Sequence, residues 1–307
     1  MGKRITVIGT INKDLILPFR GAPIESLGGI FYTTAILGCL MEPDDEIIPV
    51  SFLGEDLADT VRAALLPFKN VNSNALHSIP DKNQKVILEY LSPQERREKA
   101  LFNFPPLEWK HVRNHLETDF IIVNLITGWD LSVGAFRKIV SRFGPKTYLD
   151  VHYLVKGIDS MGRRFPEKPQ SVESWLLGPS FVQMNEEEFN IISDGQLDPV
   201  HFFGKRMTPD QTLLITRGRD GVTVIYQKDG MIRGKNIAAP QVSEVVDATG
   251  CGDAFGAGFV KAFSETSDVL ESAAYANRVA AANAMLEGTN EISRLKTVMK
   301  TLSAQPQ

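Results

Sequence analysis

The feature that most constrains the fold is a regular alternation of short apolar runs with helical patterns. The first run, RITVIG at residues 4–9, is largely apolar and ends in glycine, which is typical of a buried parallel strand. Similar runs cover residues 46–53, 119–125, 146–151, 180–184 and 213–216, and helical patterns cover residues 29–40, 56–66, 132–143, 186–192 and 199–207. Strands that alternate with helices form βαβ units, so we predict an α/β fold with a mostly parallel central sheet covered on both faces.

Three segments depart from this alternation. Residues 222–226 and 231–235 flank the turn sequence Lys228-Asp229-Gly230, which predicts an antiparallel hairpin. Residues 85–91 and 99–104, joined by a charged turn at 93–98, predict two strands that stand off the main sheet. Residues 157–178 carry prolines and charges with little periodicity, and we predict a long surface loop there. The chain then ends in helical patterns over residues 252–264, 268–286 and 291–301.

Composition and charge argue against several classes of protein. The chain is 43% hydrophobic and 23% charged, which is ordinary for a soluble domain, and its net charge of -4 does not favour nucleic acid or an anionic membrane as partner. No apolar run reaches the ~20 residues of a bilayer span, and the first ten residues lack the core of a signal peptide. The presence of only two cysteines, Cys39 and Cys251, argues against a disulfide framework. We expect a cytoplasmic protein with a single domain over residues 1–307.

The segment DATGCGD, residues 247–253, carries the strongest chemical signal. Glycines just before a helix let main-chain N–H groups converge on one point, and the helix N-terminus adds positive potential there. Asp253 would be unfavourable beside an anion that only binds, but it suits a base that takes a proton from a hydroxyl attacking that anion. This is the logic of phosphoryl transfer. The alternative is that the glycines allow close helix packing and Asp253 caps the helix.

The same segment resembles the C-terminal signature of the ribokinase-like, or PfkB, carbohydrate kinase family. The resemblance implies that Asp253 is the catalytic base and that Gly250, Cys251 and Gly252 supply the anion hole. Asp247 would act near the metal or the phosphates. The similarity extends along the chain, and it implies a three-layer α/β/α fold with a small β lid.

The lid and the acceptor site are implied by residues in the first half of the chain. Lid segments are expected near residues 12–28 and 84–105. Only 13 residues separate Asp14 from Gly28, so we predict that this arm of the lid is shortened and that residues 85–104 form its main part. Asp14 would hold sugar hydroxyls, and Thr33 stands where the family usually has an asparagine. The residues implied in substrate binding are Asn12, Asp14, Gly28, Gly29, Thr33 and Asp150.

The donor site is implied by two further motifs. Asn185-Glu186-Glu187-Glu188 resembles the family's Asn-x-x-Glu motif, which organises magnesium waters and phosphates, although an acidic helix start would look the same. Residues 216–221 resemble the nucleotide-side loop. The residues implied in nucleotide binding are Asn185, Thr216, Gly218, Gly221 and Asn283, and those implied at the metal, mostly through water, are Asn185, Glu188 and Asp247.

These observations predict an ATP- and Mg²⁺-dependent kinase that phosphorylates a hydroxymethyl group of a sugar or sugar-like molecule. Three alternatives stay open: a nucleoside kinase, a phosphosugar kinase, and a non-catalytic homologue that binds sugar or nucleotide and regulates a partner. A phosphosugar would need a basic side chain, for which Lys13, Arg20 and Lys156 are the candidates. Relatives often dimerise through the lid, so a homodimer is a further expectation.

Overall fold

A nine-stranded sheet forms the centre of the computed structural model, which describes residues 2–92, 96–101 and 104–303. The strand order is β15-β14-β13-β12-β9-β8-β1-β4-β5. Every neighbouring pair from β13 to β5 is parallel, whereas β13–β14 and β14–β15 are antiparallel. The predicted parallel sheet and the predicted hairpin are confirmed. The strands are β1 (Arg4–Ile8), β4 (Glu46–Gly54), β5 (Leu76–Ile79), β8 (Phe120–Asn124), β9 (Thr147–Asp150), β12 (Phe181–Asn185), β13 (Thr212–Thr216), β14 (Val222–Lys228) and β15 (Met231–Ile237).

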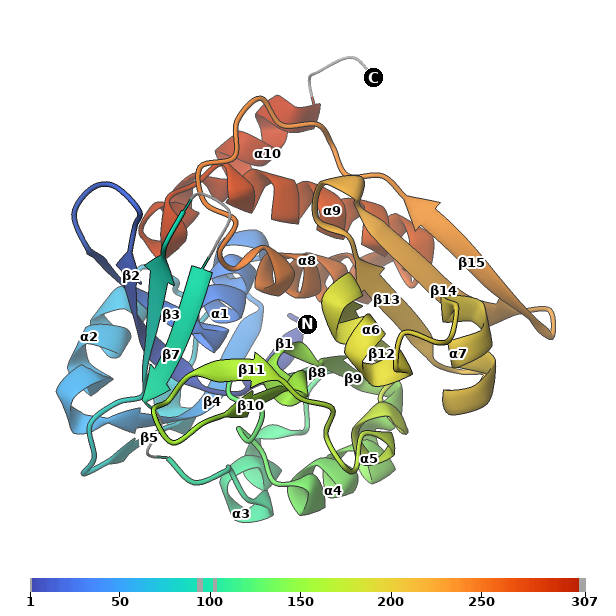
Figure 1. Cartoon of the computed structure of the whole chain (residues 1–307), viewed down its shortest axis with the longest axis horizontal. Helices are drawn as coiled ribbons and strands as arrows, with labels where there is room; N and C mark the ends of the chain where they lie inside the picture. The colour runs from blue at the N-terminus through green and yellow to red at the C-terminus, as the bar shows by residue number, and fades with distance from the viewer. Residues whose placement is uncertain (1, 93–95, 102–103, 304–307) are drawn as a thin grey trace.

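Helices cover both faces of this sheet (Figure 1). Alternate residues of a strand point to opposite faces, so Val7 of β1 packs in one core and Ile8 in the other. One core contains α1 (Ile30–Leu40), α2 (Glu55–Leu65), α8 (Cys251–Thr266), α9 (Val269–Ala284) and α10 (Leu295–Ser303). The other contains α3 (Trp109–Val112), α4 (Val133–Phe143), α5 (Glu173–Leu176), α6 (Glu186–Ser193) and α7 (Pro199–Arg206).

Short 3₁₀ turns connect several of these elements, at 73–75 (η1), 113–115 (η2), 144–146 (η3), 152–155 (η4), 218–220 (η5) and 288–294 (η6). Helix α1 packs against β1 and β4 of the sheet and against α8, α10 and η6, which explains why nearly all of its residues are buried. Within the described ranges, none of the helices combines the length and the hydropathy that a bilayer span requires.

A separate four-stranded sheet, ordered β3-β2-β6-β7, forms the lid. Its strands are β2 (Ile11–Leu17), β3 (Ile24–Gly29), β6 (Lys85–Tyr90) and β7 (Arg96–Leu101). The arm predicted to be shortened contributes strands of 7 and 6 residues, and the other arm contributes strands of 6 and 6. Both arms therefore supply two full strands. Of the predicted turn at 93–98, residues 93–95 lie outside the described residues, and residues 96–98 belong to β7, so the turn prediction was wrong there.

The segment predicted as a long surface loop is in part a hairpin that joins the lid. Within it lie β10 (Lys156–Ile158) and β11 (Arg164–Pro166), which pair antiparallel, followed by α5. The Ala100 N–H of β7 donates to the Gly162 carbonyl at 2.8 Å, so the hairpin turn extends the edge of the lid sheet. Strands of three residues carry too little periodicity to be recognised, which is why the loop prediction was wrong here.

Candidate active site

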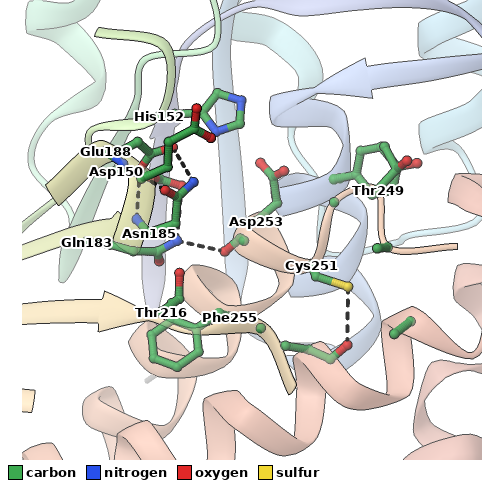
Figure 2. A pocket seen from close by; sticks show the side chains of 18 of the residues that line it. Asp150, His152, Gln183, Asn185, Glu188, Thr216, Thr249, Cys251, Asp253 and Phe255 are labelled. Atoms are coloured by element: carbon green, nitrogen blue, oxygen red, sulfur yellow. Dashed lines mark hydrogen bonds between the residues drawn. The ribbon is translucent and has the colours of Figure 1, made fainter. Parts of the chain in front are cut away.

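A cavity of ≈ 720 Å³ lies where the lid faces the carboxyl ends of the parallel strands (Figure 2). Ligand sites of α/β sheets occur at this edge. Of the residues predicted for the site, those that line the cavity are Asn12, Asp14, Gly29, Asp150, Asn185, Glu188, Thr216, Gly218, Gly221, Gly250, Cys251, Gly252 and Asp253. Gly28, Thr33, Asp247 and Asn283 are not part of its lining.

Asp253 lies in the first turn of α8 and is 7% exposed. Its Oδ1 atom accepts hydrogen bonds from Thr33 Oγ1 at 3.1 Å and from Asn124 Nδ2 at 2.7 Å. Burial raises the pKa of this carboxyl to about 7, and the two hydrogen bonds oppose that rise by stabilising the charged form. A carboxylate with a pKa near neutrality is well suited to accept a proton.

The loop before α8 turns at Gly250, which has φ 75° and ψ 4°. A Cβ atom at this position would lie 2.3 Å from Cδ1 of Tyr32, so only glycine fits. Among the described residues, the N–H groups of Gly250 and Gly252 have no hydrogen-bond acceptor, whereas the Cys251 N–H donates to the Ala248 carbonyl at 3.3 Å. Of the three main-chain N–H groups predicted for the anion hole, one is therefore hydrogen-bonded within the turn and two remain to bind an anion.

Asp247 and Asn283 stabilise this loop through hydrogen bonds to the backbone of Thr249. Asp247 Oδ1 accepts from the Thr249 N–H at 2.8 Å, and Asn283 Nδ2 donates to the Thr249 carbonyl at 3.0 Å. Asn283 was predicted at the adenine pocket, but its position on α9 turns it toward the loop. The α9 residues that line the cavity are Asn277, Ala280, Ala281 and Ala284, which share one helix face by their spacing.

Cys251 lines the cavity as a protonated thiol. Burial raises its pKa to about 11, and its Sγ atom donates to the Ala280 carbonyl at 3.5 Å. A thiol in this state is a poor nucleophile and a poor metal ligand. We therefore interpret Cys251 as a small packing residue.

Acidic residues from β9 and α6 form a second wall. Asn185 and Glu188 make a capping box: Glu188 Oε2 accepts from the Asn185 N–H at 2.8 Å, and Asn185 Oδ1 accepts from the Glu188 N–H at 2.9 Å. Glu188 Oε1 also accepts from Asn185 Nδ2 at 2.7 Å. Burial raises the pKa of Glu188 to about 7. Burial and the neighbouring carboxylates of Glu188 and Asp253 raise the pKa of Asp150. The alternative of a solvated acidic helix start fits Glu186, which is exposed and pairs with Arg217 at 3.1 Å, but not Glu188.

No sequence motif predicted two residues of the site, Gln183 and Asn124. Gln183 Nε2 donates to the Gly252 carbonyl at 3.1 Å and to Asp150 Oδ2 at 3.3 Å, so it joins the α8 loop to the acidic wall. Its Oε1 atom accepts from the Tyr148 hydroxyl. Asn124 bonds to Asp253 from the end of β8. The available signal was a polar residue at or near the end of an apolar strand.

The lid supplies the wall that contains Asn12 and Asp14. Asn12 Nδ2 donates to Asp14 Oδ1, and Asn12 is 2% exposed. Gly28 lies opposite Asn12 in the β2–β3 pair, and a Cβ atom there would lie 2.0 Å from Asp14 Oδ2. Glycine at this position therefore leaves space for the Asp14 carboxylate.

The family comparison agrees with this geometry. Residues 156–296 match the family model described as pfkB family carbohydrate kinase. The resemblance to the pfkB family is confirmed. The match contains Asn185, Glu188 and the whole loop before α8, so this part of the cavity lining lies within the matched region. No curated protein matches the sequence.

Solved structures show that the whole chain has a ribokinase-like fold. Ribokinase of Thermotoga maritima superposes with a TM-score of 0.75 at 15% identity, covering 99% of this chain and 100% of that chain. Ribokinase of Arabidopsis thaliana, solved with ribose and ATP, gives 0.74 at 17%, covering 99% and 100%. A nucleoside kinase of Burkholderia thailandensis, solved with inosine, gives 0.74 at 17%, covering 97% of each chain. The fold is thus shared with sugar and nucleoside kinases.

Proposed function

We propose that this chain is a kinase that transfers the γ-phosphoryl group of ATP to a hydroxymethyl group of a sugar or sugar-like acceptor. The observation that carries the proposal is the position of Asp253. Its carboxylate is buried in the cavity wall, two residues along the chain from the Gly250–Cys251 turn, and that same cavity is lined by Asn12 and Asp14. Ribokinase-family kinases are phosphotransferases with alcohol acceptors, which supports the proposal.

The acceptor hydroxyl would be held by Asn12 and Asp14 from the lid. Asp253 would take the proton from this hydroxyl as its oxygen attacks the γ-phosphorus. The main-chain N–H groups of Gly250 and Gly252 would donate to the phosphoryl oxygens, on which negative charge develops. Thr33 and Asn124 both donate to Oδ1 of Asp253, which fixes the carboxylate, and neither donates to its Oδ2 atom.

The opposite end of the cavity fits a nucleotide. Thr216 and Gly218 line it after β13, and the side of α9 that lines the cavity offers Ala280, Ala281 and Ala284. Small side chains leave room for a flat ring, and the loop groups offer polar contacts to ribose and phosphate. The ribokinase of Arabidopsis thaliana was solved in complex with ATP, which supports this assignment.

The residues present also fit Mg²⁺ held mainly through water. Asn185 and Glu188 offer oxygen atoms at the cavity wall, the donor type that Mg²⁺ prefers. In the described part of the chain, no group of three or more His, Cys, Asp or Glu is placed to hold a metal directly. Mg²⁺ keeps several waters and binds through few carboxylates together with substrate phosphates, and it would neutralise phosphate charge here.

An ADP-release assay across sugars and nucleosides tests the proposal. The Asp253→Asn variant keeps the shape of the side chain and both hydrogen-bond acceptances but removes the base, so kcat should fall by about 100-fold or more while ATP affinity changes little. The matched control is Asp198→Asn, at the exposed N-cap of α7, which should leave kcat unchanged. Near-normal turnover in Asp253→Asn would show that Asp253 is not the catalytic base. Ligand binding without ADP release for any acceptor would favour the regulatory homologue instead.

A further inference from the structure

We propose that the acceptor is an uncharged nucleoside-like alcohol, in which a hydroxymethyl sugar carries a planar ring system. This inference rests on the proposed kinase function and adds the class of acceptor to it. It follows from the two chemically different walls that surround the acceptor half of the cavity.

The first wall offers oxygen acceptors to hydroxyl groups. Asn12 Oδ1 is buried and has no hydrogen-bond partner among the described residues. A buried polar atom in this state is costly unless a ligand satisfies it. Asn12 lines the cavity beside Asp14, so this wall suits the hydroxyls of a sugar.

The other wall of the acceptor half is apolar. Val86 and Leu88 of β6 are 6% and 4% exposed, and both line the cavity together with Ile126 and Val155. Asp14 pairs with Val86 in the β2–β6 ladder, so the apolar wall begins one strand away from the sugar-binding carboxylate. A free monosaccharide carries hydroxyls on almost every carbon and would leave several of them unpaired here. The faces of a planar ring lose no hydrogen bonds against such a wall and gain from burial.

An aromatic pair extends this wall. The rings of His152 and Tyr153 stack at 4.4 Å with an interplanar angle of 12°, and both residues line the cavity. The Tyr153 hydroxyl donates to Glu98 Oε2 at 2.5 Å, which fixes the ring between the core and the lid strand β7. His152 has φ 40°, an uncommon and strained conformation for a non-glycine residue, held here in the cavity wall. Lys156 Nζ and Arg164 Cζ also lie 4.9 Å from the centre of the Tyr153 ring, so His152 is the member of the pair that would stack with a planar group.

The placement of the cations argues against a phosphorylated sugar. Lys13 pairs with Glu25 at 2.8 Å, and neither residue belongs to the cavity lining. Arg20, the second predicted candidate, is likewise absent from the lining. Lys156 does line the cavity, but its amine makes a cation–π contact, 4.9 Å from the centre of the Tyr153 ring. The other lysine or arginine of the lining is Arg219, next to Gly218 after β13, and a phosphate near Asp14 would meet a carboxylate.

Calorimetric titration of the full chain without nucleotide tests the class of acceptor. The ligands are adenosine, cytidine, ribose and ribose 5-phosphate. Nucleosides should bind about 10-fold more tightly than ribose or ribose 5-phosphate, because only they fill the apolar wall. Leu88→Ala should weaken nucleoside binding by about 10-fold and change ribose binding far less. The matched control is Ile87→Ala on the opposite face of the same strand, which should change neither.

His152→Ala serves as a second variant on a half-buried residue should Leu88→Ala fail to fold. It should also lower nucleoside affinity selectively. Ribose binding as tight as nucleoside binding, no binding of any nucleoside, or preferred binding of ribose 5-phosphate that is lost in Lys156→Ala would each overturn the inference. Failure of the kinase proposal has a different signature, because nucleosides would then bind as expected while ADP release stayed at background with every acceptor.

Discussion

Thr33 Oγ1 donates to Asp253 Oδ1 at 3.1 Å across 220 positions of the chain. This bond joins the first turn of α1 to the first turn of α8 and sets the carboxylate at the cavity wall. Asn124 Nδ2 donates to the same oxygen at 2.7 Å. The reactive group thus depends on side chains from three distant parts of the sequence, and four predictions follow from its surroundings.

The acid limb of the pH–rate profile should depend on these two hydrogen bonds. The base must be ionised, so kcat/KM should rise with pH through the Asp253 pKa of about 7. Thr33→Val and Asn124→Ala remove donors that stabilise the charged form, and each should move the midpoint upward by about one pH unit. Thr34→Val is the matched control, since Thr34 Oγ1 is buried with no hydrogen-bond partner in the described ranges. A midpoint that stayed fixed would assign the titration to another group, such as Glu188.

Asp253→Asn should stabilise the protein at neutral and higher pH. The folded-state pKa of about 7 lies above the ordinary value of 3.8, so the folded chain holds its proton more tightly than the unfolded chain. Stability is therefore lost as pH rises from about 4 to 7, and asparagine, which cannot ionise, escapes this loss. The difference in Tm between variant and parent should be small near pH 4 and largest above pH 7. A difference that is flat across this range, or that shrinks with rising pH, would contradict the raised pKa.

Gly250→Ala and Gly252→Ala should separate folding from chemistry. A Cβ atom at residue 250 would sit 2.3 Å from Tyr32 with φ at 75°, so this variant should lose roughly 1–3 kcal/mol of stability. A Cβ atom at residue 252 would meet only Gln183 Nε2 at 3.5 Å, so Gly252→Ala should retain its Tm and lose turnover through crowding of the phosphoryl group. Denaturant unfolding and ADP release measure the two effects. Equal stability losses in both variants would refute the assigned roles.

Gln183→Leu should reduce turnover as well as stability. It removes the hydrogen bonds from Gln183 to the Gly252 carbonyl and to Asp150, so the α8 loop loses its tie to the acidic wall. We expect kcat to fall by about 10-fold and stability by roughly 1–3 kcal/mol. Gln211→Leu is the matched control: it loses two buried bonds of 2.7 Å outside the cavity and should lose stability alone. Unchanged kcat in Gln183→Leu would make this residue purely structural.

The sequence by itself determined the parallel sheet, the order of most helices and the loop before α8. These features are local: a buried strand needs a short apolar run, a helix needs its period, and the glycines of residues 250–252 stand next to the aspartate they serve. The resemblance to the pfkB family rests on the same short segments. Where the signal was weak, as in the three-residue strands β10 and β11, the sequence predicted a loop.

Only the tertiary structure decided which distant side chains complete the site. Thr33, Asn124 and Gln183 reach Asp253 and its loop through packing between elements, and no spacing along the chain encodes these contacts. Burial likewise sets the pKa values, because desolvation is a property of the assembled wall. The same holds for Asn283, which helix α9 turns toward the loop and away from the cavity. The sequence determines which residue types are available for chemistry. The distances between these side chains, and their charges at neutral pH, are set only when the helices pack against the sheet.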